Sequence, residues 1–410
     1  MCPFFIFLLF RARFDRFCAR FRNSYALLIV SIIDKMCIFA HYARVCVNYI
    51  AMDIELFHDI LKIDSTSGKE AALADFLQER LLASCSRVER FDVGDGTSNL
   101  LFSWGEPEIV FCSHLDTVPP YIPPVFDGAA VRGRGSCDAK GQIFAMYEAC
   151  KVLESKGYDG FGLLLLAGEE TGSFGAKAFR EQYPGAEWII VGEPTDNHMA
   201  SASKGTKSFE VTFEGKAFHS GYPQYGLSAV EMFNDFMNAL RSIVFPKDEV
   251  LGDTTWNVGK LMSDNPQNIL SDRLSCRVYF RTTFETDEMV CNVMKNIAGE
   301  DARLRFGRRR VQDGSDIVAK DVAQWQKSMT VKAFGGDTPT RYEVLEGFPA
   351  KPVAFGSDAP QLTNFRRKIL CGPGSILVAH RPEEHILLDD IRVAIDNYVR
   401  MYEAIVGEKA

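Results

Sequence analysis

The stretch "GFGLLLLAGEETGSFG", residues 160–175, places two charged residues directly after an apolar run. Leu163–Ala167 is short and bounded by glycines, which predicts a strand buried on both faces. Charges at the end of such a strand are costly unless they are paired. Glu169 and Glu170 therefore either begin the next helix, whose N-terminus favours acidic side chains, or belong to a functional site.

Apolar strands alternate with amphipathic helices from Met52 to about Ala202. This alternation predicts an α/β fold, with a mixed and largely parallel sheet that is covered by helices on both faces. The expected strands are "EIVFCSHLD" (108–116), "GLLLLAGEE" (162–170) and "EWIIVGEP" (187–194), and the expected helices are "GQIFAMYEACKVLESKG" (141–157) and "GAKAFREQY" (175–183).

The pattern changes between residues 206 and 310. Two segments, "KSFEVTFEGKAF" (207–218) and "RLSCRVYFRTTF" (273–284), alternate polar and apolar residues with a period of two, which predicts half-exposed strands. The helical segments 228–244 and 286–297 accompany them. We therefore expect an inserted α+β domain at 206–310, between the two parts of the main domain, 52–205 and 311–410.

Charge and cysteine content limit the classes of partner. The net charge is −8, and because residues 1–51 carry +5, the remainder carries −13. An acidic body argues against a nucleic-acid or anionic-membrane partner, and "RFGRRR" (305–310) is interpreted as a solvated strand or turn. The eleven cysteines form no CxxC pair, which favours a reducing compartment, the cytoplasm.

The first 51 residues differ from the rest of the chain. "CPFFIFLLF" (2–10) is apolar before any positive charge, the reverse of a secretory signal. "ALLIVSII" (26–33) is too short to span a bilayer. We therefore expect the domain that carries the activity to begin near Met52, and residues 1–51, the leader, to be dispensable for folding and activity. A membrane anchor is the alternative.

Acidic residues and histidines follow several of the predicted strands. Open α/β sheets bind ligands beyond the carboxyl ends of their strands, and zinc accepts histidine and carboxylate ligands at catalytic sites. The residues that follow predicted strands are His114, Asp116, Glu169, Glu170 and Glu193. The glycine-rich turn "VRGRGSCDAKG" (131–141) adds Asp138, and "GPGSILVAHRPEEH" (372–385), near the C-terminus, adds His380.

Six motifs occur together in one order: "HLDTVPP", "GRGSCDAKG", "GEETGSFGAKAF", "VGEPT", "GKAFHSGYP" and "GPGSILVAHRPEEH". From Met52 to the C-terminus the chain thus resembles the dinuclear zinc amidohydrolases and exopeptidases. This family includes acetylornithine deacetylase, succinyl-diaminopimelate desuccinylase, aminoacylase and glutamate carboxypeptidases. The resemblance implies a metal-bridged hydroxide that hydrolyses an N-acyl amino acid, most like acetylornithine deacetylase of arginine biosynthesis. A di- or aminopeptidase acting on short peptides is the alternative.

The resemblance also implies which residues hold the two divalent metals, zinc or else cobalt. His114 and Glu193 would bind one metal, and Glu170 and His380 the other. Asp138 would bridge both, and the family carries a cis peptide bond directly after this residue.

Two further residues receive roles close to the metals. The resemblance implies that Glu169 is the general base, which takes a proton from the attacking water and later passes it to the leaving amine. Asp116 would hold the second ring nitrogen of His114, a contact that fixes the tautomer of a metal ligand. A solvated aspartate at the strand end is the simpler interpretation of Asp116.

The inserted domain is implied to act as a lid and dimerisation domain. In the family, the histidine of "HSGYP", here His219, stabilises the oxyanion in the active site of the partner subunit, which implies a homodimer. Arg281, with Asn268 and the turn Gly356–Ser357, would bind the substrate carboxylate, for which the planar guanidinium is suited. A structural histidine and a solvated arginine are the alternatives.

The sequence argues against two other classes of protein. A non-catalytic zinc-binding protein would be marked by loss of the base, but Glu169 is present. A nucleotide-binding oxidoreductase would need a third glycine where "GRGSCD" carries Asp138, so the glycine fingerprint of that class is not met.

Overall fold

The computed structural model describes residues 52–298, 308–310, 316–318 and 329–409. Ile54–Ala410 form one compact unit, to which all elements below belong. The predictions for the leader and for residues 305–307 lie outside the described residues. Within those ranges, no helix has the length and apolar character needed to cross a membrane.

The central sheet has six strands in the order β1-β2-β6-β3-β7-β17. Strand β3 runs parallel to β6 and β7, and β17 runs parallel to β7. Strand β2 pairs antiparallel with both β1 and β6. The predicted mixed, largely parallel sheet is therefore confirmed. The strands are β1 (Arg87–Gly94), β2 (Thr97–Trp104), β3 (Ile109–His114), β6 (Phe161–Leu166), β7 (Trp188–Val191) and β17 (Arg367–Leu370).

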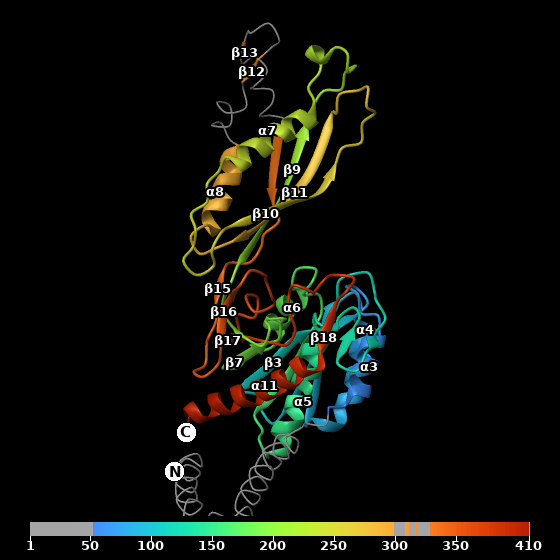
Figure 1. The fold of residues 1–410 in the computed structure, drawn as a ribbon, viewed down its shortest axis with the longest axis vertical. Coiled ribbons are helices and arrows are strands. Elements are labelled where there is room, and N and C mark those ends of the chain that lie inside the picture. Colours follow the sequence, from blue (N-terminus) through green and yellow to red (C-terminus); the bar gives the residue numbers. More distant parts are fainter. Residues whose placement is uncertain (1–51, 299–307, 311–315, 319–328, 410) are drawn as a thin grey trace, which may run out of the picture. The chain divides into compact units, whose positions relative to one another are not determined.

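Helices cover both faces of this sheet, as predicted. On one face α5 and α11 lie side by side (Figure 1), and Phe111 of β3 contacts Tyr398 of α11 at 5.8 Å between ring centroids. The alternate residues of β3, Val110 and Cys112, pack on the other face in the same cluster as Phe179 of α6. The helices are α3 (Ile54–Lys62), α4 (Ala71–Leu81), η1 (Leu82–Ser84), α5 (Lys140–Ser155), α6 (Phe174–Gln182) and α11 (Leu388–Lys409).

The leucine run forms β6 at the middle of the sheet. Leu163, Leu164, Leu165 and Leu166 are all 0% exposed, so each contributes about 1.5–3 kcal/mol of hydrophobic stabilisation. This burial on both faces was predicted from the sequence. Because β6 is held in place by this burial, the position of its C-terminal end, which Glu169 and Glu170 follow, is fixed as well.

The inserted region forms a second sheet, in the order β10-β11-β9-β14, with all pairs antiparallel. Helices α7 and α8 bury their apolar residues against it in one cluster. Its elements are β9 (Gly205–Glu214), η2 (Pro223–Tyr225), α7 (Ala229–Arg241), β10 (Thr255–Met262), β11 (Arg273–Thr282), α8 (Asp287–Ala298) and β14 (Met329–Ala333).

The expected domain boundary at residue 310 is wrong for this sheet. Strand β14 comes from the segment assigned to the main domain, yet it pairs with β9, Met329 opposite Phe213 and Ala333 opposite Phe209. The reason is that β11 pairs with only one edge of β9, and the short strand β14, which follows the insert in the sequence, pairs with the other edge. Part of the basic run is a strand, since β12 (Arg308–Arg310) pairs with β13 (Asp316–Val318).

Two three-stranded sheets hold loops beside the central sheet. One has the order β15-β8-β16 and the other β18-β5-β4. The pairing of β18 with β5 brings the segment after His380 against the turn that carries Asp138. Their strands are β4 (Val125–Phe126), β5 (Ala130–Arg132), β8 (Met199–Ser203), β15 (Thr340–Arg341), β16 (Ala350–Val353) and β18 (His385–Leu387).

Candidate active site

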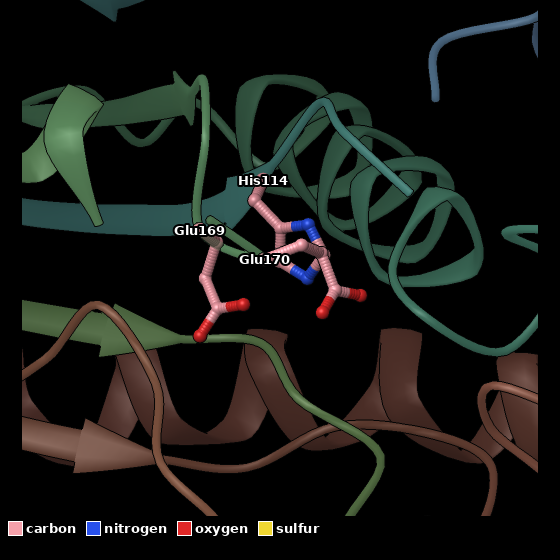
Figure 2. Close-up of side chains that lie close together, drawn as sticks. All are labelled: His114, Glu169 and Glu170. Carbon is pink, nitrogen blue, oxygen red and sulfur yellow. The ribbon is translucent and has the colours of Figure 1, made fainter. Parts of the chain in front are cut away.

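The ends of three parallel strands meet at one edge of the central sheet. His114 is the last residue of β3, Glu169 and Glu170 follow β6, and Glu193 follows β7. Figure 2 shows the ring of His114 close to the carboxylates of Glu169 and Glu170. The carboxyl ends of parallel strands lie together, so this convergence follows from the topology.

Three groups of potential metal ligands are found here: one is His114, Glu169 and Glu170, and the other two overlap in one residue. His114, Asp138 and Glu193 form one of these two, and Asp138, Glu170 and His380 form the other; in each, the ligand atoms lie within 4.8 Å of one another. Asp138 Oδ1 is 3.1 Å from His114 Nε2, and its Oδ2 is 3.2 Å from His380 Nε2. The structure thus brings all five predicted ligands together, with Asp138 in the shared position.

The electrostatics of the cluster fit bound cations. Burial raises the pKa of Glu193 and of Glu169 well above the usual value, and neighbouring carboxylates add to the effect. Hydrogen bonds to Asp138 and Glu170 raise the pKa of His380 to about 10. Several carboxylates this close repel one another unless positive charge compensates them. Histidine and carboxylate donors suit zinc and similar divalent metals, so the residues present fit the metals that the resemblance implies.

Asp116 is fully buried and connects three parts of the site. Its backbone oxygen is 2.9 Å from His114 Nδ1, and its carboxylate oxygen Oδ1 lies 3.5 Å from the same nitrogen. Its two carboxylate oxygens accept the backbone N–H groups of Glu169 and Glu170, at 3.0 and 3.1 Å, and the hydroxyl of Ser67 at 3.0 Å. Asp116 therefore fixes both the histidine ring and the turn of the two glutamates.

A cavity of about 330 Å³ opens onto the cluster. Arg281, Gly356 and Ser357 line it, together with Lys177 of α6 and Tyr279 of β11. The guanidinium of Arg281 lies over the Tyr279 ring, 5.1 Å from its centroid, and no described carboxylate forms an ion pair with it. A cavity of this size accepts a small ligand, and Arg281 offers it an unpaired cation.

His219 and Asn268 lie elsewhere on the insert. Both are exposed and neither is among the residues that line the cavity. They are neighbours, because Ser220 donates its backbone N–H to the carbonyl of Asn268 at 2.9 Å and His219 is paired with Ile269. The role of His219 in a partner subunit and the role of Asn268 in substrate binding stay predictions.

Two residues that were not predicted from the sequence are Glu384, which contacts the turn that carries Asp138, and Arg134 within that turn. Glu384 and Arg134 form a buried ion pair, and Glu384 accepts backbone N–H groups from the turn that carries Asp138. Glu384 stands four residues after His380 in "HRPEEH", but no periodicity around it indicates its contact with the turn. The expected cis peptide bond between Asp138 and Ala139 is present.

Comparison with known proteins places the chain in a family. Residues 110–404 match peptidase family M20/M25/M40. The chain belongs to this family. It is 31% identical over 363 residues to a peptidase M20 domain-containing protein of Schizosaccharomyces pombe, which covers 85% of this chain and 83% of that protein. It is also 31% identical over 394 residues to a protein of Aspergillus oryzae named a probable carboxypeptidase, with 85% and 86% covered.

Solved structures share the fold. A tripeptidase from Staphylococcus aureus superposes with a TM-score of 0.68 at 18% identity, covering 84% of this chain and 95% of that one. An M20 metallo-carboxypeptidase from Sulfolobus solfataricus gives 0.65 at 16% identity, covering 86% and 98%. The resemblance to dinuclear metal amidohydrolases and exopeptidases is confirmed, and the chain is an enzyme of this class. Acetylornithine as substrate, zinc as metal and the homodimer stay predictions.

Proposed function

We propose that this enzyme hydrolyses the amide bond that precedes an amino acid with a free carboxylate, in a short peptide or an N-acyl amino acid. The observation that carries the proposal is the pair of ligand groups sharing Asp138, with Glu169 beside them. His114 and Glu193 would hold one divalent metal, and Glu170 and His380 the other. Bound there, the metals would lower the pKa of water to about 7 and polarise the scissile carbonyl.

The two adjacent glutamates differ in their surroundings, which supports different roles. Glu170 Oε1 lies 2.9 Å from His380 Nε2. The side chain of Glu169 forms no hydrogen bond or ion pair with any described residue, and burial raises its pKa well above the usual value. A carboxyl group of raised pKa accepts and returns a proton near neutral pH. Glu169 is therefore the proposed base toward water and acid toward the leaving amine.

Arg281 supports a substrate with a free carboxylate. Its guanidinium lies in the same cavity as Glu169 and the ligand cluster, and it lacks an acidic partner among the described residues. Guanidinium pairs with a carboxylate through two parallel hydrogen bonds. Carboxypeptidase and deacylase substrates both present this group on the amine side of the bond. The names of the Aspergillus oryzae and Staphylococcus aureus proteins favour a peptide; acetylornithine is the second candidate.

A substrate panel tests the proposal. The purified chain, supplied with zinc or cobalt, would receive dipeptides, N-acetylated and N-succinylated amino acids, and the same compounds with the C-terminal carboxylate amidated. We expect cleavage of the free acids and a loss of at least tenfold in kcat/KM on amidation, with the loss abolished in Arg281→Ala. Equal cleavage of amides, or a requirement for a free N-terminal amine, would instead favour an aminopeptidase.

A further inference from the structure

A single carboxylate organises the turn that carries Asp138. Glu384 is 1% exposed, and its Oε1 accepts three backbone N–H groups, from Gly135 at 2.9 Å and from Cys137 and Asp138 at 3.1 Å. Its Oε2 pairs with the guanidinium of Arg134, which is 2% exposed. Three converging N–H groups and one cation thus surround one buried anion, an arrangement of strong, charge-assisted hydrogen bonds.

Glu384 also belongs to the segment that follows His380. Gly133 donates its N–H to the backbone oxygen of Glu384 at 3.0 Å, and the pairing of β18 with β5 begins at the next residue, His385 opposite Arg132. The turn carrying Asp138 and the segment after His380 are therefore joined through Glu384. On the side of the cavity, the Asp138 carboxylate and the His380 ring lie 3.2 Å apart.

We propose that Glu384, charge-paired with Arg134, is a positioning residue that fixes the backbone of Asp138 and thereby the affinity of both metal positions. This inference rests on the proposed two-metal function. Asp138 is the carboxylate that both ligand groups share, so a displacement of its backbone moves a ligand of each. Residues that orient metal ligands typically change metal affinity or activity by about 10–100-fold when they are replaced.

Two substitutions separate the contacts of Glu384. Glu384→Leu removes the acceptor of all three N–H groups and leaves the Arg134 guanidinium buried without its partner. Glu384→Gln keeps one oxygen for the N–H groups but turns an amide NH₂, a donor, toward Arg134. If the inference holds, the leucine variant loses more affinity than the glutamine variant, because backbone positioning depends on the shared acceptor.

A suitable control variant lowers the stability of the fold at a position that does not contact the turn carrying Asp138. Leu153 is 0% exposed near the C-terminal end of α5, roughly 20 Å along the helix from its first residue at 1.5 Å per residue. Leu153→Ala leaves a cavity in the core. We expect it to lower the unfolding midpoint while its metal affinity stays that of the wild type.

The experiment is a titration of the full-length, metal-free protein with zinc in competition with a chromophoric chelator. We expect Glu384→Leu to bind both metals about 10–100-fold more weakly, Glu384→Gln to fall between it and wild type, and saturating zinc to restore much of kcat in both. The absorption spectrum of cobalt-loaded protein should also differ between wild type and Glu384→Leu.

Wild-type affinity in Glu384→Leu, accompanied by a lower unfolding midpoint, would overturn the inference and leave Glu384 a purely structural residue. If that variant does not fold, wild-type affinity in Glu384→Gln would overturn it in the same way. A wild type that binds two metals but cleaves no amide would refute the proposed function, and the zinc affinities of the Glu384 variants would still decide the positioning role. A wild type that binds no metal would refute both.

Discussion

Asp116 is the residue through which His114 and the two glutamates depend on one another. Its buried carboxylate accepts the backbone N–H groups of Glu169 and Glu170 and lies beside the ring of His114. In Asp116→Asn, one oxygen is replaced by an NH₂ group that faces a donor. We expect about 10–100-fold lower kcat with weaker binding of one metal, measured by steady-state kinetics and elemental analysis. Ser67→Ala, which removes only the hydroxyl contact of Asp116, is the milder control. Equal effects of the two variants would contradict the connecting role.

Residues at strand ends could be predicted from the sequence because each stands directly after an apolar run. His114, Glu169 and Glu193 are of this kind, and the structure places them together. Glu384 could not be predicted in this way, since its partner Arg134 lies 250 residues earlier. That contact depends on the pairing of β18 with β5, two strands of three residues each, which are too short to show a period.

At the scale of elements, the parallel strands β3, β6 and β7 were predicted because they are apolar throughout. The hairpin β1–β2 and the strands β10 and β14 were not. β10 has mostly exposed side chains, and β14 follows a segment of which residues 319–328 are not described. The edge of β9 that β11 leaves unpaired can be completed by a strand from any part of the chain, and here that strand is β14. The sequence around β14 showed no sign of this pairing, so the boundary at 310 was placed too early.

His219 belongs to the inserted domain, and its position leads to a second prediction. His219 is exposed and outside the cavity of its own chain, so we expect it to act in the site of a partner subunit. His219→Ala should lower kcat more than tenfold with metal content unchanged. Mixed dimers of His219→Ala with Glu169→Ala should regain activity in one of two sites, because one site then receives an intact base and an intact histidine. Purified heterodimers without any regained activity would show that His219 does not act across subunits. Homodimers of each single variant are the controls.

At the scale of the whole molecule, the cluster couples metal binding to stability. Without a cation, Glu169, Glu170 and Glu193 repel one another in a buried space, and the pKa of each is raised, first by burial. A ligand that binds only the folded state stabilises it by about 2.7 kcal/mol at a concentration of 100 times Kd. We expect chelation to lower the melting temperature by several degrees and added zinc or cobalt to restore it. Identical melting curves with and without metal would contradict a metal centre at these strand ends.

Glu169 and Glu170 are proposed to have different roles, Glu169 in proton transfer and Glu170 in metal binding, and metal content measured beside kcat in two variants tests this division. Glu169→Gln should keep both metals, since the amide is nearly isosteric and the proposal gives Glu169 the role of base rather than of ligand. It should still lose activity by about 10²–10⁴-fold, at the upper end because one residue serves both proton transfers. Glu170→Gln should lose one metal first, and excess zinc or cobalt should restore part of its rate. If Glu169→Gln loses metal and is rescued by it while Glu170→Gln keeps both metals and stays inactive, the roles are reversed and the account is wrong.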